Sequence, residues 1–431
     1  MAGLWWPTPA AALREVDCNT PADFCTGDPC VTTDEIKVTV PVCTLTFAGR
    51  TLVLKHVVFL PSGGALSLTA RTIEVRRRID GTHFKSGAGD GADITLIAGD
   101  RITVRARLDA AGRTSTGNIR LTAGGSVELR DQLRARAHGD TATASGGTVT
   151  IQAGGSVIST KEGKMNLRGR YNHTSGGQVV ISGATGVNIE GKINVRGSQG
   201  GAVTVTATAG SVRMAGTTRA DGAPSAGGNV TINASGSLTL EKGINTSGGE
   251  PTAGSITLTA GGVMRLAALR ADGHLNASAG MITALGQSVI ADRIRARGGA
   301  DGGVVNLSTS AGDLTVEQID VRGRDGMGGS VTVVSAGDLT NEQGTNVSGG
   351  DFAAGEAHFS AAGDITLGLS TAIRFEAGGF PGGVIEADAA GDLTVEGKFK
   401  TTVGGCIGLM AGGVLDTTGA EFDQPVMPTC P

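Results

Sequence analysis

Apolar and polar residues alternate along most of this chain in short runs that are separated by glycine. The run Gly228-Asn-Val-Thr-Ile-Asn-Ala is representative, and a second run, Leu238-Thr-Leu, follows it closely. Because side chains in a β-strand point alternately to opposite faces, a period of two predicts strands with one buried face. The pattern therefore predicts an all-β protein built from short strands.

The same phrase recurs at a nearly fixed interval. The eleven intervals between Gly117 and Gly405 average about 26 residues. Repeats are expected to open at Gly117, Gly147, Gly177, Gly201, Gly228, Gly254, Gly273, Gly303, Gly329, Gly355, Gly383 and Gly405. A repeat of this length with strand periodicity indicates a solenoid, in which each coil contacts mainly its neighbours.

The expected fold is a right-handed parallel β-helix, because parallel crossover connections are right-handed in nearly all cases. We expect about 15 coils between residues 36 and 415, with three short strands per coil and a rod about 70 Å long. In the coil quoted above, Val230 and Ile232 should point inward from the first strand, Leu238 and Leu240 from the second, and Ile244 from the third.

The two ends of the solenoid need separate treatment. Residues 1–35 are expected to form an N-terminal arm and cap, and residues 416–431 a C-terminal tail. Open solenoid ends expose unpaired strand edges, which pair with another chain unless they are covered. The apolar start of the chain has two interpretations, a signal-peptide remnant or an assembly arm. The predicted assembly interface comprises Leu4, Trp5, Trp6, Cys406, Ile407, Leu409 and Leu415.

Six cysteines lie near the two ends of the chain and none lies between. Their spacing does not match a zinc site, whereas their even number is typical of disulfides and of an oxidising, extracellular location. Cys406 and Cys430 are about one coil apart in sequence, so they should lie on adjacent coils and form a disulfide. The other four allow three pairings, of which we favour Cys25 with Cys30 and Cys18 with Cys43.

Charge and hydropathy argue against two classes of function. The net charge is −4 and both signs are spread along the chain, so the sequence has no basic segment typical of nucleic-acid binding. Every apolar run falls short of the roughly 18 residues that a membrane span needs. Glycine accounts for 72 of 431 residues without a collagen period, and it marks the turns between strands.

The repeat phrase resembles that of a known family. Segments such as Gly-Gly-Asn229-Val-Thr-Ile-Asn-Ala-Ser-Gly-Ser-Leu-Thr-Leu are similar to the repeat region of filamentous haemagglutinin-type adhesins, which are large β-helices on bacterial surfaces. The resemblance covers residues 64–415, and it implies an exported bacterial protein with a structural or adhesive role. The chain contains no Asn-Pro dipeptide, so it lacks the Asn-Pro-Asn motif of that family's secretion domain.

No arrangement of residues indicates catalysis. Enzymatic β-helices bring carboxylates and a basic residue together in one groove. Here the six histidines are scattered, and phosphate-loop, nucleophile-elbow and zinc-protease motifs are absent. We therefore expect no enzymatic activity, and no cofactor apart from a possible calcium ion. A carbohydrate-active enzyme ranks third among the functions considered, after a structural filament and an adhesin.

Two polar columns are candidates for ligand binding. The aspartate of a recurrent Ala-Gly-Asp turn occupies one position on four consecutive coils, at Asp313, Asp338, Asp364 and Asp392. Calcium would relieve the repulsion between these carboxylates, although solvated turn aspartates are the simpler interpretation. Arginines near the end of the third strand either bind an anionic polysaccharide or form solvated ion pairs with Asp320 and Glu317. These arginines are Arg168, Arg196, Arg297 and Arg322.

The expected function is that of a secreted structural protein at a bacterial surface or in extracellular matrix. Its main partner would be a second copy of itself, joined head to tail in a filament. A surface polysaccharide is a possible further partner. The alternative is a monomeric or surface-tethered adhesin that binds glycans or proteins through its side faces.

Overall fold

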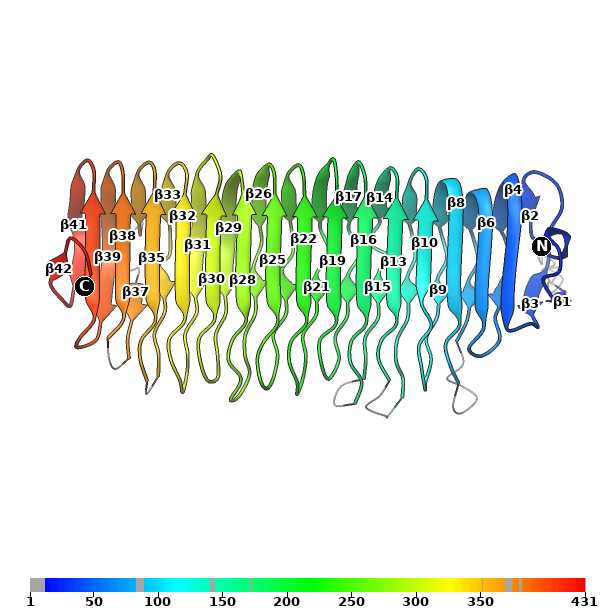
Figure 1. The fold of residues 1–431 in the computed structure, drawn as a ribbon, viewed down its shortest axis with the longest axis horizontal. Coiled ribbons are helices and arrows are strands. Elements are labelled where there is room, and N and C mark those ends of the chain that lie inside the picture. Colours follow the sequence, from blue (N-terminus) through cyan, green and yellow to red (C-terminus); the bar gives the residue numbers. More distant parts are fainter. Residues whose placement is uncertain are drawn as a thin grey trace, which may run out of the picture.

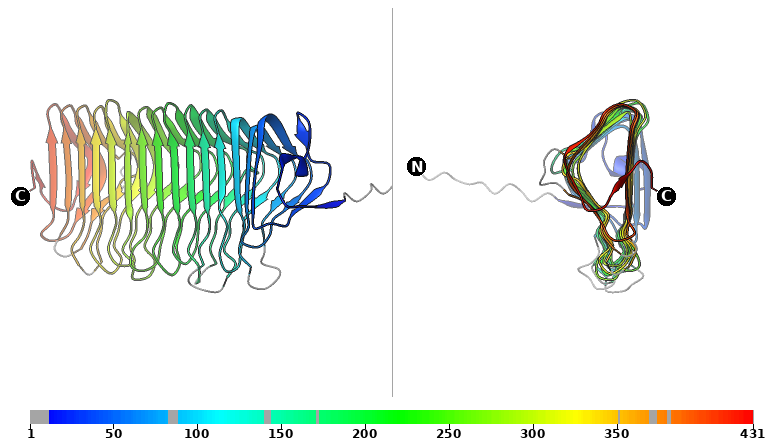
Figure 2. Two further views of the ribbon diagram at one scale, coloured as in Figure 1. Left: turned by 45° about the vertical axis from the view of Figure 1, so that its right-hand side comes forward. Right: turned by 90° about the vertical axis from the view of Figure 1, so that its left-hand side faces the viewer.

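In the computed structural model the chain winds into a rod of parallel β-strands, with the first and last strands at opposite ends (Figure 1). The structure describes residues 12–82, 89–139, 144–170, 173–350, 352–368, 374–379 and 382–430. About 15 coils stack with a repeat of about 26 residues, which confirms the predicted solenoid. Viewed along the rod, the coils superimpose, and stacked loops protrude along one edge (Figure 2).

The first strand of each coil lies on the first strand of the next coil, in register. We call this stack the first column. It consists of β4 (Val42–Leu54), β6 (Ala65–Val75), β8 (Asp93–Val104), β10 (Ile119–Ala123), β13 (Thr148–Ala153), β16 (Gln178–Gly183), β19 (Ala202–Ala207), β22 (Asn229–Ala234), β25 (Ser255–Ala260), β28 (Met281–Gly286), β30 (Val304–Thr309), β32 (Ser330–Ser335), β35 (Glu356–Ala361), β38 (Val384–Ala389), β40 (Cys406–Ala411) and β42 (Val426–Met427).

The second column begins at β2 and includes the C-terminal halves of β4, β6 and β8. Its other strands are β2 (Cys30–Val31), β11 (Val127–Leu129), β14 (Ser156–Ser159), β17 (Gly186–Ile189), β20 (Ser211–Met214), β23 (Leu238–Leu240), β26 (Val263–Leu266), β29 (Ser288–Arg295), β31 (Leu314–Asp320), β33 (Leu339–Asn341), β36 (Ile365–Leu367), β39 (Leu393–Thr401) and β41 (Leu415–Phe422).

The third column is made of shorter strands, together with the ends of β29, β31, β39 and β41. Its other strands are β1 (Leu13–Val16), β3 (Glu35–Val38), β5 (Val58–Phe59), β7 (Ile79–Asp80), β9 (Leu108–Asp109), β12 (Leu133–Arg134), β15 (Met165–Asn166), β18 (Ile193–Asn194), β21 (Thr218–Arg219), β24 (Ile244–Asn245), β27 (Leu269–Arg270), β34 (Thr345–Asn346) and β37 (Arg374–Ala377). The described residues also include one short 3₁₀ helix, Pro21–Asp23.

The core is a continuous set of aliphatic ladders inside the coils. In the coil that opens at Gly228, the five residues predicted to point inward are all buried: Val230, Ile232, Leu238, Leu240 and Ile244. Each stacks on the equivalent residue of the next coil; Val230, for example, pairs in register with Val203 and Ile256. Large aromatic side chains fill the core near the ends instead, with Phe24 and Phe47 at one end and Phe359 and Phe399 towards the other.

The turn before each first-column strand brings the backbones of neighbouring coils close together. A Cβ atom added to Gly228 would lie 1.9 Å from the carbonyl oxygen of Gly201, far inside van der Waals contact. Gly254 and Gly280 make the same approach to the glycine of the preceding coil, at 1.7 and 1.8 Å. At these three positions only glycine fits without displacing the backbone.

One predicted coil opening was wrong. The glycine that follows Gly254 in the column is Gly280, whereas Gly273 lies beyond the third-column strand β27 and bridges to Gly248. The true strand of this coil is β28, because Met281 pairs with Ser255. The residues after Gly273 alternate like a strand, but they form a turn in which Leu275 has a φ of +53°.

The stack extends beyond the boundaries that we expected at both ends. β1 pairs with β3, so residues 13–16 already form part of the third column. At the other end β41 continues to Phe422, where Phe399 and Phe422 are paired in register and their ring centroids lie 5.4 Å apart. The chain therefore continues the solenoid past residue 415, because inward-facing residues still occur at the required spacing.

Candidate functional sites at the two ends and on one face

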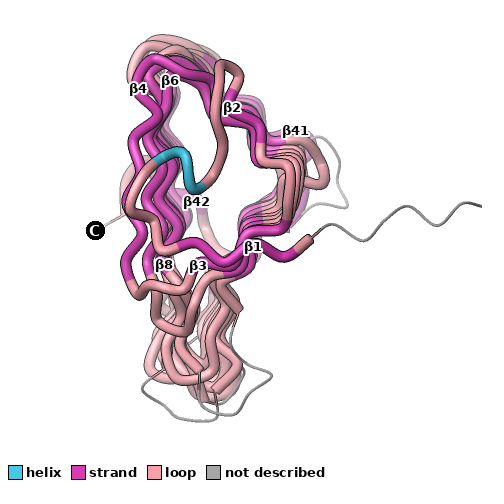
Figure 3. Tube along the Cα trace, turned by 90° about the vertical axis from the view of Figure 1, so that its right-hand side faces the viewer, coloured by secondary structure: helices cyan, strands magenta, loops and turns pink. Residues whose placement is uncertain are grey.

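The N-terminal end of the rod is covered by its own chain. The 3₁₀ helix Pro21–Asp23 lies across the mouth of the first coil (Figure 3). Phe24, which follows it, is 1% exposed and packs edge-on against Phe47, with ring centroids 6.4 Å apart. These contacts shield the first apolar coil from water, so this segment is a cap.

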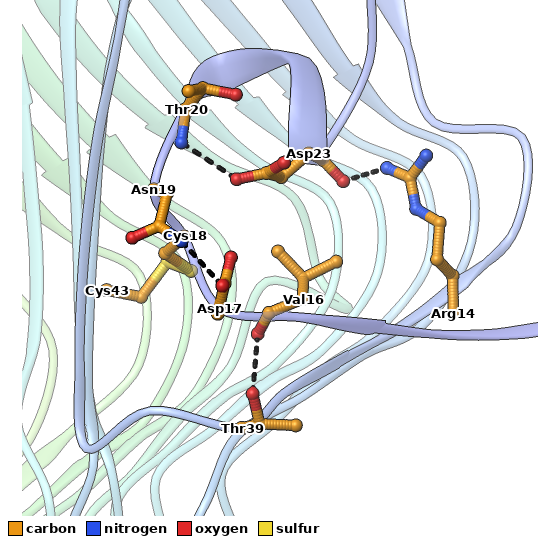
Figure 4. The surroundings of a disulfide bond; sticks show 9 residues. All are labelled: Arg14, Val16, Asp17, Cys18, Asn19, Thr20, Asp23, Thr39 and Cys43. Atoms are coloured by element: carbon orange, nitrogen blue, oxygen red, sulfur yellow. Dashed lines mark hydrogen bonds between the residues drawn. A yellow bond between two sulfur atoms is a disulfide. The ribbon is translucent and has the colours of Figure 1, made fainter.

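Disulfides and hydrogen bonds fix the cap (Figure 4). The bonds join Cys18 to Cys43 and Cys25 to Cys30, with Cα–Cα distances of 5.4 and 5.3 Å, and these are the pairs that the sequence analysis favoured. The Thr39 hydroxyl donates to the Val16 carbonyl at 3.1 Å. Together with the Cys406–Cys430 disulfide at the other end, these bonds suggest an oxidising environment.

The C-terminal end is covered less completely. The disulfide between Cys406 and Cys430, with a Cα–Cα distance of 5.7 Å, holds β42 over part of β40. Strand β41, in contrast, pairs only with β39 within the described part of the chain. Its other edge therefore has no strand partner among the described residues.

Leu415 shows what this open edge exposes. It is the last member of an inward-facing ladder formed by Leu314, Leu339, Ile365 and Leu393, each of which is at most 1% exposed. Leu415 itself is 44% exposed, because no described strand stacks on it. Val414, the preceding residue, and Val426 on β42 are also exposed.

The residues predicted for an assembly interface have different environments. Leu4, Trp5 and Trp6 lie outside the described residues. Cys406, Ile407 and Leu409 are buried within the chain itself, so they cannot form a contact surface unless the tail is displaced. Leu415 alone among the described residues of that set is exposed. The exposed Val414 and Val426 were missed, although their position in the last coil could have indicated them.

The aspartate column forms a hydrogen-bonded ladder between coils. Asp313 accepts the N–H of Asp338 at 3.0 Å, Asp338 that of Asp364 at 2.9 Å, and Asp364 that of Asp392 at 2.8 Å. The last carboxylate accepts the N–H of Val414 at 2.7 Å. Amide donors therefore offset the repulsion that suggested calcium, and we propose no calcium site there. In the described residues no group of three or more His, Cys, Asp or Glu is placed to hold a metal ion.

The predicted arginines lie where the third column runs into the protruding loops. Gly298 bridges to Gly323, which places the preceding Arg297 and Arg322 on adjacent coils. The carboxylate between them, Asp320, is buried, so the expectation of solvated ion pairs was wrong at this position. Glu317 instead accepts a hydrogen bond from the Gln343 side chain. Arg196 makes a similar contact with Asp221 on the next coil, at 2.5 Å.

The N-terminal part of this face is also electropositive. Burial and the nearby positive charges of Arg136, Arg134, Arg168 and Arg170 lower the pKa of His138 from 6.5 to about 4. The neutral ring lies 3.0 Å from the Arg134 guanidinium through its Nε2 atom. Four arginine side chains therefore lie close enough to His138 to disfavour its protonation.

Comparison with protein-family models, with curated proteins and with solved structures found no match. The structure confirms a β-solenoid of about 15 coils, but no relative supports the resemblance to haemagglutinin-type repeats. Among the described residues no helix has the length and apolar character required to cross a membrane.

Proposed function

We propose that this chain is a structural rod of the extracellular space or bacterial surface, whose copies join head to tail into a filament. The proposal rests on Leu415, an inward-facing core residue left 44% exposed at the end of a buried ladder. A coil from a second copy would extend the free edge of β41 with main-chain hydrogen bonds. Burying the exposed part of Leu415 would contribute about 1 kcal/mol.

The difference between the two ends supports a head-to-tail contact. The N-terminal end carries a disulfide-tied cap, whereas β41 at the C-terminal end has a free edge within the described chain. Contacts between unlike surfaces produce open filaments unless the geometry closes into a ring. The partner that fits the open end is the N-terminal coil of the next copy, with residues 1–11 as the candidate arm.

Two further parts of the proposal rest on other observations. We assign the protein to an extracellular location because disulfides persist in oxidising compartments. We assign a non-catalytic role because the turn aspartates are engaged by amides of the following coil rather than gathered in a groove.

Electron microscopy of the oxidised protein over a range of concentrations tests the proposal. We expect filaments from the wild type and short rods from Leu415→Lys, because a lysine on an open edge opposes strand addition. The matched control is Ile290→Lys, which alters a leucine-sized residue that is 39% exposed in the middle of the same column.

Three results would overturn the proposal. They are short rods of wild type at every concentration, filaments that persist in Leu415→Lys, and rods of twice the single length. The last result would show that two C-terminal ends pair with each other.

A further inference from the structure

An arginine-lined hollow lies on the third-column face, away from both ends of the rod. It spans three successive coils, at β27, β29 and β31, and has a volume of about 420 Å³. The backbone of Gly273, Gly298, Gly299 and Gly323 forms part of its wall. Its volume lies within the range of small-ligand sites.

The charged groups of the hollow do not balance. Arg270 and Arg295 share the carboxylate of Asp272, with Nε–Oδ2 distances of 2.5 and 2.7 Å. Arg297 and Arg322 share that of Asp320, with Nε–Oδ2 and Nε–Oδ1 distances of 2.6 and 3.1 Å. Arg324, the fifth arginine of the lining, lies 3.7 Å from the carboxylate of Asp325. Five guanidinium groups therefore face three carboxylates, which leaves two positive charges uncompensated.

The geometry keeps these charges directed at the hollow. The side chains of Asp272 and Asp320 are only 4% and 6% exposed, so the arginines are held from behind by buried acids. The side chains of Arg270 and Arg322 remain 42% and 43% exposed and line the opening. A fixed guanidinium with free donors is the preferred partner of carboxylate and sulfate groups.

An apolar side chain stands at the rim of the same hollow. Leu275 is 83% exposed and has a φ of +53°, a backbone conformation that leucine rarely adopts. Residues kept in such conformations cluster at ligand sites, where the surrounding structure imposes them. An exposed leucine next to arginines matches a ligand that carries both oxyanions and an apolar C–H surface.

We propose that this hollow binds an acidic saccharide, with the two uncompensated arginine charges paired to its carboxylate or sulfate groups and Leu275 packed on a sugar ring. A nucleic acid fits less well, because no Phe, Tyr or Trp lines the hollow to stack on a base. This site lies on the side of the rod, so it does not depend on the proposed filament contact.

Calorimetric titration with defined oligosaccharides tests the proposal. The probes are a galacturonate hexamer, a sulfated maltohexaose and unmodified maltohexaose. We expect binding of one or both acidic probes, which distinguishes carboxylate from sulfate recognition, and no binding of the neutral one. Added salt should weaken the binding, because it screens exposed charges.

Substitutions locate the binding within the hollow. The double variant Arg270→Gln/Arg322→Gln should bind about tenfold more weakly or worse, which corresponds to about 1.4 kcal/mol. It should still fold, because Asp272 keeps Arg295 and Asp320 keeps Arg297. The control Arg130→Gln/Arg213→Gln removes the same charge from exposed second-column positions, and we expect its affinity to be unchanged.

Several outcomes would overturn the proposal. One is that neither acidic probe binds, and another is that both double variants lose affinity equally. A third is that a single-stranded oligothymidine binds at least as tightly and depends on the same arginines, which would assign the hollow to nucleic acid. Thermal unfolding of each variant verifies that lost binding does not reflect lost folding.

Discussion

The C-terminal tail offers the most direct test of how the end of the rod is covered. Residues 423–430 are held by the Cys406–Cys430 disulfide and by two register pairs, Ile407 with Val426 and Gly408 with Met427. The N–H of Cys430 also donates to a carboxylate oxygen of Glu386 at 3.0 Å. The perturbation is the double substitution Cys406→Ser/Cys430→Ser.

The sizes of the competing terms predict that the tail detaches. The disulfide closes a sequence separation of 24 residues, which restricts the unfolded chain by about 3.5 kcal/mol in the entropic model. The remaining tail hydrogen bonds contribute about 1 kcal/mol each. Ordering the backbone costs about 1 kcal/mol or more for every residue of the tail. A few bonds cannot offset that cost without the disulfide.

Hydrogen exchange followed by mass spectrometry measures the consequence. We expect amides of β40 to lose protection in the double variant, while those of β38, one coil inside the rod, remain protected. A variant that ends at Phe422 should reproduce this pattern, because it lacks the tail altogether. Unchanged protection of β40 in the serine variant would refute the reasoning, since it would mean that side-chain packing alone holds the tail.

Four further predictions follow from the coil interior, the charged face and the start of the chain. Gly228→Ala should destabilise the rod by about 2 kcal/mol in urea unfolding, because its Cβ would lie 1.9 Å from a backbone oxygen. The control Gly99→Ala should change the stability by less than about 0.5 kcal/mol, because its Cβ would have no atom nearer than 3.8 Å. Asp320→Asn should cost about 1–2 kcal/mol in the same assay, because it leaves two arginines without their buried carboxylate, although their partial exposure limits the loss. The pKa of His138 is lowered from 6.5 to about 4, so as the pH falls through this range the unfolded chain binds a proton at His138 and the folded chain does not. The free energy of unfolding should therefore drop by about 1 kcal/mol between pH 7 and pH 5, after allowance for the partial exposure of the ring. The variant His138→Gln should lack this part of the pH dependence. Deleting residues 2–11 should prevent filament formation in electron microscopy without changing the unfolding midpoint, and unchanged filaments would exclude these residues as the connecting arm.

The coil interior could be predicted from the sequence because its pattern is repeated many times. The inward positions of Val230, Ile232 and Leu238 follow from period-two alternation, and the same alternation recurs in the neighbouring coils. The Cys406–Cys430 pair was predictable for the same reason, since a separation near one coil places two residues side by side. A pattern that is weak evidence for a strand in one coil becomes strong evidence for a solenoid when it repeats at a fixed interval.

The coil that contains Gly273 could not be placed correctly from local alternation. The residues after it alternate like a strand, but they form the turn with Leu275, and the strand itself begins at Met281. The column of close backbone contacts decides the register, because Gly280 and not Gly273 fits against Gly254. Sequence alternation does not report such three-dimensional contacts.

The charged hollow was predicted only in part. The arginine positions at Arg297 and Arg322 were visible, but the burial of Asp320 was not, because burial depends on how the protruding loops stack. The recurrence of Arg and Asp at the same third-column position was the only sign of the hollow in the sequence. The structure shows that Arg270 and Arg295 share a second buried acid, Asp272, so that two such clusters lie side by side.

The two ends of the rod impose a direction on any filament that it forms. Phe24 and Phe47 close the core at the N-terminal end, so that end offers strand edges rather than an exposed apolar interior. Leu415 leaves the core partly open at the other end. A contact between the capped ends of two copies would bury no exposed core. A contact between two open ends would set their strands antiparallel, so it would not continue the parallel columns. We therefore expect any filament to be polar, with each open end receiving the N-terminal coil of the next copy, because that arrangement continues all three columns.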